Sequence, residues 1–415
     1  MNNSDPNFSR RSILTTSLAA LVGMRATAHA AVQTAAKAPT SAYDLGPGVH
    51  YLNHASIGTV PRAVREAHAG YLAQCESNPW LYVWNGAWDE PFESARSELA
   101  DFCGASSNDI AFLRNTTEAF SLLANGLALG ADDEVLFSSL NHTGASRAFE
   151  LAGKARGYRV RRFEFPVAEV PKLSAADVVR LHVEALSEQT KLLVVPHVDN
   201  QVGLKLPLRE LARAARTAGV RWIAVDGAQT VGAHPLALRE LGCDLYATSG
   251  HKWLQGPKGT GLAYVSPELR DELRPIIATW GHDRWKDSAR VYEDYGTRDL
   301  ASVLALADAA RFQTSAGWSS AATAPLHARI LEHVQGDERI SLASANDPSL
   351  SGSIVTIAVS GADSRALART LFEQHGFVVR PFQIGQRQAL RLSPNRMNTL
   401  AEIDGFFEAL RAELS

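Results

Sequence analysis

The chain has 415 residues, 46% of them hydrophobic, which is enough to bury the core of one large and one smaller domain. Its 41 basic and 44 acidic residues give a formal net charge of −3. This balance excludes the strongly basic surface typical of nucleic-acid-binding and polybasic membrane-binding proteins. We therefore expect small molecules and other protein chains as partners, and no nucleic acid.

The first 30 residues contain the three parts of an export signal in the right order. The pair Arg10 and Arg11 is followed by a short apolar run and then by the small-residue pattern AHA at residues 28–30. The apolar run is too short for a spanning helix, so no stable membrane anchor is expected. The pattern predicts a twin-arginine signal peptide over residues 1–30, recognition by the twin-arginine export machinery and a periplasmic location. The alternative is a disordered tail that happens to carry two arginines.

Residues 31–48 are predicted to form an alanine-rich linker, and an amphipathic helix is predicted over residues 61–76. The following stretch, SNPWLYVWNGAW, places four aromatic side chains close together: Trp80, Tyr82, Trp84 and Trp88. Such a cluster is more often a core patch or a subunit interface than a substrate contact, and all three interpretations stay open here.

The three cysteines are Cys75, Cys103 and Cys243, too few for a disulfide framework. A Cys75–Cys103 bridge is conceivable, and free buried cysteines are the alternative. None has metal-ligand spacing with a histidine, so no metal site is expected.

Between residues 90 and 310, apolar runs rich in β-branched residues alternate with helical patterns. The predicted strands are EVLFSS, YRVRRFEF, KLLVVPHV, RWIAVDG, CDLYATS and GLAYVS. This alternation predicts a large α/β domain over residues 49–318, with a mostly parallel sheet sandwiched by helices. After residue 318 the pattern changes, and we predict a smaller C-terminal α+β domain over residues 319–415.

Two charged side chains lie where predicted strands end, and ligands gather at the carboxyl ends of parallel strands. Asp226 ends RWIAVD, and Lys252 follows CDLYATS in the motif SGHKW. A buried lysine loses its charge readily and becomes a nucleophilic amine that condenses with an aldehyde. Pyridoxal 5′-phosphate is such an aldehyde, and it also needs an acid beneath its pyridine nitrogen, the role we assign to Asp226.

The other requirements of this cofactor are also met. In RNTTEAF, Asn115 and Glu118 resemble a capping box, which places Thr116 and Thr117 in the first turn of a helix, where free N–H groups favour an anion such as a phosphate. The remaining candidates are Ser249 and His251 at the phosphate, Asn200 and Gln229 at the phenolic oxygen, and His142 against the ring face. Each alone has an ordinary structural explanation, such as a helix cap or a loop histidine, but together they form a workable site.

The motifs NTTEA, NH, DNQVG, VDGAQTVG, SGHKWLQGPKGTG and YGTRD resemble those of class V aminotransferase-fold proteins. These are fold-type I pyridoxal-phosphate enzymes, among them cysteine desulfurases, kynureninase and isopenicillin N epimerase. The resemblance covers nearly all of the mature chain and is strongest to the isopenicillin N epimerase-like group, because of YGTRD and the NPW segment. It implies a seven-stranded-type sheet in the large domain and a homodimer.

The resemblance also implies individual roles. Lys252 is the lysine that forms the Schiff base, and Thr297 in YGTRD reaches the cofactor phosphate of the neighbouring subunit. Arg391 in LRLSPNRMNT binds a substrate α-carboxylate, with Asn53 as a second substrate-binding residue; the alternative for Arg391 is an ordinary surface arginine. The stretch FVVRPFQIGQRQALRLS lacks the catalytic cysteine of desulfurases, so sulfur abstraction through a protein thiol is not expected.

We therefore expect an exported enzyme that acts at the α-carbon of an amino acid or an amine-bearing secondary metabolite, with Lys252 as the base. Epimerase-like or aminotransferase-like chemistry is favoured, and a lyase or oxidative tailoring enzyme of a siderophore-type peptide is the alternative. A non-catalytic binding module on the same fold is the alternative from another class. A nucleotide-binding protein is disfavoured, because no G-x-G-x-x-G follows the first strand of a β-α-β unit.

Overall fold

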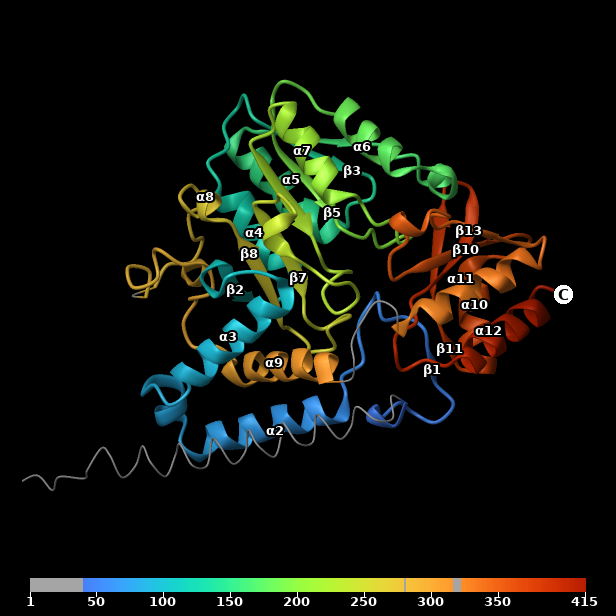
Figure 1. Cartoon of the computed structure of the whole chain (residues 1–415), viewed down its shortest axis with the longest axis horizontal. Coiled ribbons are helices and arrows are strands. Elements are labelled where there is room, and N and C mark those ends of the chain that lie inside the picture. Colours follow the sequence, from blue (N-terminus) through green and yellow to red (C-terminus); the bar gives the residue numbers. More distant parts are fainter. Residues whose placement is uncertain (1–39, 280, 316–321) are drawn as a thin grey trace, which may run out of the picture.

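The computed structural model describes residues 40–279, 281–315 and 322–415. The predicted signal peptide and most of the predicted linker lie outside the described residues. Figure 1 shows a larger lobe built around one sheet and a smaller lobe that contains the C-terminus. Within the described part of the chain, no helix is both long and apolar enough to cross a membrane.

The larger lobe contains a seven-stranded, mostly parallel sheet, as predicted. Its strands, in spatial order, are β2 (Ile110–Leu113), β8 (Gly261–Val265), β7 (Leu245–Ser249), β6 (Trp222–Asp226), β5 (Thr190–Pro196), β3 (Glu134–Ser138) and β4 (Arg159–Phe163). Strand β8 is antiparallel to both of its neighbours, and the pairs from β7 to β4 are parallel. All six predicted strands are present, and only the short β2 was not predicted.

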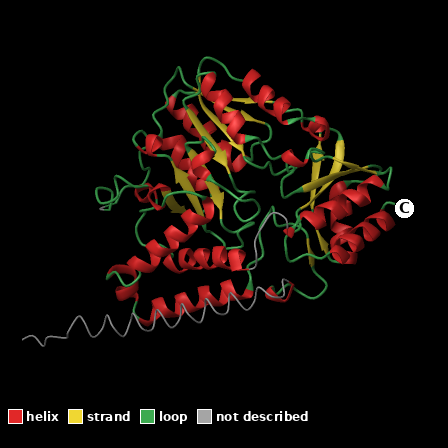
Figure 2. Ribbon diagram, viewed as in Figure 1, coloured by secondary structure: helices red, strands yellow, loops and turns green. Residues whose placement is uncertain are grey.

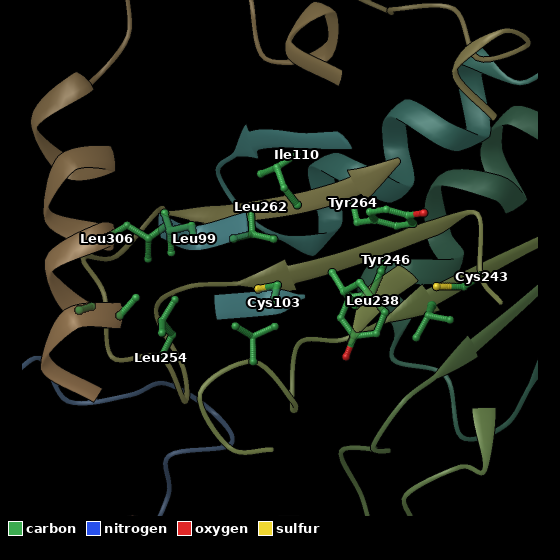
Figure 3. Packing of buried hydrophobic residues seen from close by; sticks show 14 of the residues in the cluster. Leu99, Cys103, Ile110, Leu238, Cys243, Tyr246, Leu254, Leu262, Tyr264 and Leu306 are labelled. Atoms are coloured by element: carbon green, nitrogen blue, oxygen red, sulfur yellow. The ribbon is translucent and has the colours of Figure 1, made fainter. Parts of the chain in front are cut away.

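Helices cover both faces of this sheet, because alternate strand residues point to opposite sides and both sides are apolar. One face packs against α3 (Asp89–Cys103), α6 (Ala175–Glu184), α7 (Leu208–Thr217) and α9 (Leu300–Ser315), with α2 (Arg62–Ser77) packed on α9. The other face packs against α4 (Thr116–Gly126), α5 (Thr143–Arg156) and the short α8 (Pro267–Arg270). Figure 3 shows Leu99 and Leu306, from α3 and α9, beside Leu262 of the sheet.

The smaller lobe has an antiparallel sheet with helices on one side (Figure 2). Its strands, in spatial order, are β12 (Arg380–Ile384), β13 (Arg387–Leu392), β10 (Val355–Val359) and β9 (Ile340–Leu342). Its helices are α10 (Ala324–Gln335), α11 (Ser364–His375) and α12 (Leu400–Glu413). These elements share a hydrophobic core, to which Leu52 of the N-terminal segment also contributes.

The N-terminal segment joins the two lobes. Strand β1 (His50–Tyr51) pairs in parallel with β11 (Phe377–Val378), so the segment that we grouped with the large domain pairs with the small one. The predicted linker is not free at its end: the Tyr43 side chain is buried, and its hydroxyl donates to Oε1 of Gln255, 2.8 Å away. Gln255 lies three residues after Lys252, and so the N-terminal segment contacts the loop that holds this lysine.

Short helical segments complete the fold: η1 (Thr40–Ala42), the π-helical η2 (Trp80–Trp84), η3 (Ser107–Asp109), η4 (Val167–Lys172), η5 (Leu238–Glu240), η6 (Ala289–Tyr292) and η8 (Pro348–Leu350). The aromatic cluster around η2 is divided. Tyr82 and Trp88 are buried in the core, whereas Trp80 and Trp84 remain 68% and 53% exposed. The three cysteines are free, so the conceivable Cys75–Cys103 bridge is not formed.

Candidate active site

A cavity of about 280 Å³ lies where β6 and β7 of the large sheet end and the small lobe begins. It collects every predicted site residue except Asn53 and Thr297: Thr116, Thr117, His142, Asn200, Asp226, Gln229, Ser249, His251, Lys252 and Arg391. These residues come from separate strand ends, helix starts and the small-lobe sheet. The large-lobe residues converge because the carboxyl ends of parallel strands open on one edge of the sheet, and Arg391 reaches this edge from the small lobe.

The amine of Lys252 lies in this cavity close to a carboxylate. Burial lowers the pKa of Lys252 to about 8, and the charge of Asp226 acts in the opposite direction. The lysine loop is packed tightly against Gly58, whose N–H donates to the carbonyl of His251 at 2.8 Å. A Cβ at Gly58 would stand 1.9 Å from the carbonyl oxygen of Lys252, so only glycine fits there. Lys252 thus loses its proton far more readily than a solvated lysine, and its loop is well fixed.

Asp226 ends β6 and is buried. Its Oδ1 accepts a hydrogen bond from the Ala228 N–H at 3.0 Å, and burial raises its pKa while the charge of Lys252 lowers it. A buried carboxylate facing a cavity is stabilised by a partner that carries a proton. The ring nitrogen of a pyridinium is such a partner.

The N-terminus of α4 faces the same cavity. Asn115 caps this helix by accepting from the Glu118 N–H at 3.1 Å, and Ser249 Oγ accepts from the Thr116 N–H at 3.3 Å. The predicted capping box is only half formed, because the Glu118 carboxylate accepts from the Arg114 N–H instead of the Asn115 N–H. The free N–H groups, the hydroxyls and the helix dipole fit a phosphate.

The N-terminus of α5 approaches the same point. His142 caps α5, since its Nδ1 accepts from the Gly144 N–H at 3.0 Å. A Cβ at Gly144 would stand 3.0 Å from Thr117 Oγ1, which shows how closely the two helix starts approach. Because Nδ1 accepts, the neutral ring carries its proton on Nε2. Burial, together with the charge of Lys252, lowers the pKa of His142, and so the imidazole is neutral and suited to stacking.

Gln229 is held by two hydrogen bonds. Its Nε2 donates to the Ala55 carbonyl at 3.0 Å, and its Oε1 accepts from Nε1 of Trp253 at 2.7 Å. One N–H of the amide remains for a ligand. Trp253 was not among the predicted site residues, although it follows Lys252 directly; its part in holding Gln229 depends on a contact that the sequence does not reveal.

Arg391 is buried, which rules out the alternative of an ordinary surface arginine. Its guanidinium donates to three neutral oxygens: the Asn200 carbonyl at 2.7 Å, Asn53 Oδ1 at 3.0 Å and Ser56 Oγ at 2.7 Å. Burial lowers the pKa of Arg391 to about 9, and its Nε has no hydrogen-bond partner among the described residues. A carboxylate ligand would satisfy this cation. Asn53 does not line the cavity but contacts Arg391, so its substrate-binding role stays a prediction.

Thr297 lies elsewhere. It lines a second cavity of about 430 Å³, together with Trp84, Trp88 and Trp285. Thr297 therefore does not lie beside the predicted phosphate-binding residues of its own chain. The first cavity also contains a residue that we did not predict, Arg380, which lies in the segment FVVRPF.

The sequence is similar to that of known enzymes over most of its length. Residues 50–406 match the family Aminotransferase class-V. Isopenicillin N epimerase from Streptomyces clavuligerus is 30% identical over 394 residues, covering 89% of this chain and 96% of that protein. Isopenicillin N epimerase from Amycolatopsis lactamdurans is 32% identical over 389 residues, with the same coverage of each chain.

Solved structures share the fold. A C-DES variant with glycine covalently linked to its PLP cofactor superposes with a TM-score of 0.79 at 21% identity, over 87% of this chain and 95% of that one. The apo cysteine desulfurase from Thermococcus onnurineus NA1 superposes with a TM-score of 0.77 at 22% identity, over 88% and 94%. With the amine, the acid and the anion cradle in one cavity, these similarities establish that the chain belongs to the class-V aminotransferase family of pyridoxal 5′-phosphate-dependent enzymes.

Proposed function

We propose that this enzyme acts at the α-carbon of an amino acid or an amine-bearing secondary metabolite, by epimerase-like or aminotransferase-like chemistry. The observation that carries the proposal is that the Lys252 amine, the Asp226 carboxylate and the Arg391 guanidinium, which donates only to neutral oxygens, share one cavity. The similarity to isopenicillin N epimerases over 89% of the chain supports the same assignment. Membership of this enzyme family favours a catalytic role over the alternative of a non-catalytic binding module.

Each residue has a distinct task in this proposal. The bound cofactor supplies an electron sink for the charge that develops on the α-carbon. Arg391 binds the substrate carboxylate through paired donors and so fixes the orientation of the α-carbon. Lys252, with its lowered pKa, accepts the α-proton at Nζ. Asp226 keeps a proton on the ring nitrogen, and no cysteine lines the cavity to abstract sulfur.

The experiment is α-proton exchange in heavy water. The cofactor-loaded enzyme is incubated with D- and L-amino acids and with peptides from culture extracts, and the products are analysed by mass spectrometry and chiral chromatography. We expect deuterium at the α-carbon of the substrate. Inverted chirality would identify an epimerase and a keto acid a transaminase, whereas an eliminated or oxidised product would favour a lyase or an oxidative tailoring enzyme. If no amine in the mixtures gains deuterium and the cofactor spectrum does not change, the proposal is contradicted.

We also propose a homodimer with shared sites, in which Thr297 binds the cofactor phosphate of the partner subunit. Support comes from the position of Thr297, which lies outside the active-site cavity of its own chain and lines the second cavity together with the exposed Trp84. Mixing the inactive variants Lys252→Ala and Thr297→Ala should restore activity, because the heterodimer contains one site with neither change. Activity that stays absent after subunit exchange, or a fully active monomer in dilute solution, would refute shared sites.

We further propose periplasmic location through the twin-arginine route, on the sequence pattern of residues 1–30. Replacing Arg10 and Arg11 with lysine should leave uncleaved precursor in the cytoplasm, because this route depends on the arginine pair. Cell fractionation with detection of the precursor measures the effect. Wild-type amounts of periplasmic product from the double variant would show that another route is used.

A further inference from the structure

Two arginines face each other across the edge of the small-lobe sheet. Arg380 of β12 is the register partner of Arg391 of β13 in their antiparallel pairing, and both line the active-site cavity. Side chains directly opposite each other in such a pair start about 5 Å apart, and like charges in this arrangement destabilise the sheet. The fold therefore tolerates an unfavourable pair at this position.

The two guanidinium groups lie on the same face of the sheet. Their central carbons are 5.5 Å and 5.2 Å from the centroid of the Phe382 ring, for Arg380 and Arg391 respectively. The alternate residues of β13, Leu390 and Leu392, point the other way into the small-lobe core. The ring thus supports both cations on the side that faces the cavity.

No acidic side chain of the described residues forms an ion pair with either arginine. The guanidinium of Arg391 donates only to neutral oxygens, and the exposed Arg380 side chain packs on the Phe382 ring. The buried Asp199 carboxylate acts on Arg391 through its charge, without an ion pair, whereas Arg380 contributes to lowering the pKa of both Lys252 and Arg391. The cavity therefore has an excess of positive charge next to the proposed substrate carboxylate.

One carboxylate compensates one of these cations. The cofactor phosphate would not occupy the arginines, because the N-terminus of α4 and Ser249 form a separate anion site for it. We infer that the substrate carries a second acidic group, which Arg380 binds while Arg391 binds the α-carboxylate. This inference rests on the proposed function, and it narrows the substrate class to dicarboxylic amino acids and to metabolites with a second carboxylate close to the amino acid group. Arg380 is then a specificity-determining residue at the mouth of the cavity.

The test uses amine-free acids, so that binding is measured without turnover. Affinities of the cofactor-loaded enzyme for succinate, glutarate and adipate are measured by isothermal titration calorimetry and compared with those for butyrate, pentanoate and hexanoate. At the best chain length we expect the dicarboxylate to bind at least about tenfold more tightly, as one additional charge-assisted contact implies. The preference should decrease as salt is raised, since Arg380 is exposed.

Two variants at position 380 and one control sharpen the test. Arg380→Gln should remove the dicarboxylate preference and leave monocarboxylate affinity within about twofold, and Arg380→Lys should keep part of the preference. The control is Arg387→Gln, in the same strand pair but outside the cavity lining, and it should retain the full preference. Because Arg380 is exposed, its replacement is compatible with folding, which circular dichroism checks.

The outcomes separate this inference from the proposed function. Equal affinity for mono- and dicarboxylates at every chain length, or an unchanged preference in Arg380→Gln, would overturn the role of Arg380 alone. Monocarboxylate binding that is insensitive to Arg391→Lys would instead contradict the proposed carboxylate site, and hence the proposed function. A substrate found by α-proton exchange should, in turn, lose affinity in Arg380→Gln when it carries the second acid.

Discussion

Replacing Lys252 with alanine is expected to abolish covalent attachment of the cofactor and to lower turnover by at least about a thousandfold, or about 4 kcal/mol of transition-state stabilisation. In our proposal, Lys252 provides both the amine that condenses with the cofactor and the base at the α-carbon. Among the described residues, no other lysine lines the cavity. Borohydride reduction followed by peptide mass spectrometry measures the attachment, with modification expected on Lys252 in the wild-type enzyme and none in the variant.

Lys258 offers a matched control for this prediction. It follows in the same loop, is exposed and donates from Nζ to the Gly58 carbonyl at 2.8 Å, but it does not line the cavity. Lys258→Ala should therefore keep the attached cofactor and most of the turnover. Reductive labelling of Lys258, or labelling that survives in Lys252→Ala, would contradict the assignment.

The lowered pKa of Lys252 also gives the attachment reaction a characteristic pH dependence. Only the neutral amine condenses with the aldehyde, and its fraction rises as pH increases through the pKa, which is about 8 in place of the usual 10.5. The rate at which apo-enzyme takes up the cofactor should therefore rise with pH and level off above about 8. A rate that still increases steeply towards pH 10 would indicate an ordinary, solvated lysine.

Asp226→Asn is expected to lower turnover by at least about a hundredfold, or about 3 kcal/mol, while the cofactor stays attached. The amide has the shape of the carboxylate and its oxygen still accepts from the Ala228 N–H, but it lacks the charge that holds a proton on the ring nitrogen. Steady-state kinetics on the exchange substrate and the cofactor absorbance spectrum measure the two effects. Since the charge of Asp226 raises the pKa of Lys252, the pH profile of cofactor uptake should also move to lower pH.

A second buried aspartate provides the control. Asp244 accepts hydrogen bonds from the Ile223 N–H and from Arg216, and it lies outside the cavity. Asp244→Asn should reduce stability but leave the turnover of the folded enzyme within a few-fold of wild type. Wild-type turnover in Asp226→Asn would show that the essential carboxylate lies elsewhere.

Much of the large lobe could be predicted because its strands are continuous apolar runs. Strand β6 and its terminal Asp226 follow from the pattern in RWIAVD, and motif resemblance placed Lys252 and the start of α4 beside it. Strand β2 was not predicted because a run of four apolar residues, IAFL, is too short to be distinguished from the end of a buried helix.

Features that depend on register or on distant contacts could not be read from the sequence. The opposition of Arg380 and Arg391 is a property of the β12–β13 pairing, and a shift of one residue would place one of them on the other face. Asn53 carries no local sign that it orients Arg391, since 338 residues separate them along the chain. The hydrogen bond from Trp253 to Gln229 likewise joins two loops through tertiary packing.

The interlocking of the two chain ends determines when catalytic competence arises during biosynthesis. The Ala55 N–H donates to Ser393 Oγ, and the Ser393 N–H donates to the Leu52 carbonyl. Arg391 also donates to Asn53, and β1 pairs with β11. A nascent chain that still has its C-terminal segment inside the ribosome has none of these partners, so the large sheet can form first but the carboxylate site cannot. Joining contacts this far apart in sequence is a slow, late step of folding. The complete site therefore forms only after translation has ended. Loss of the last strand and helix would abolish activity but leave the large-lobe core able to fold.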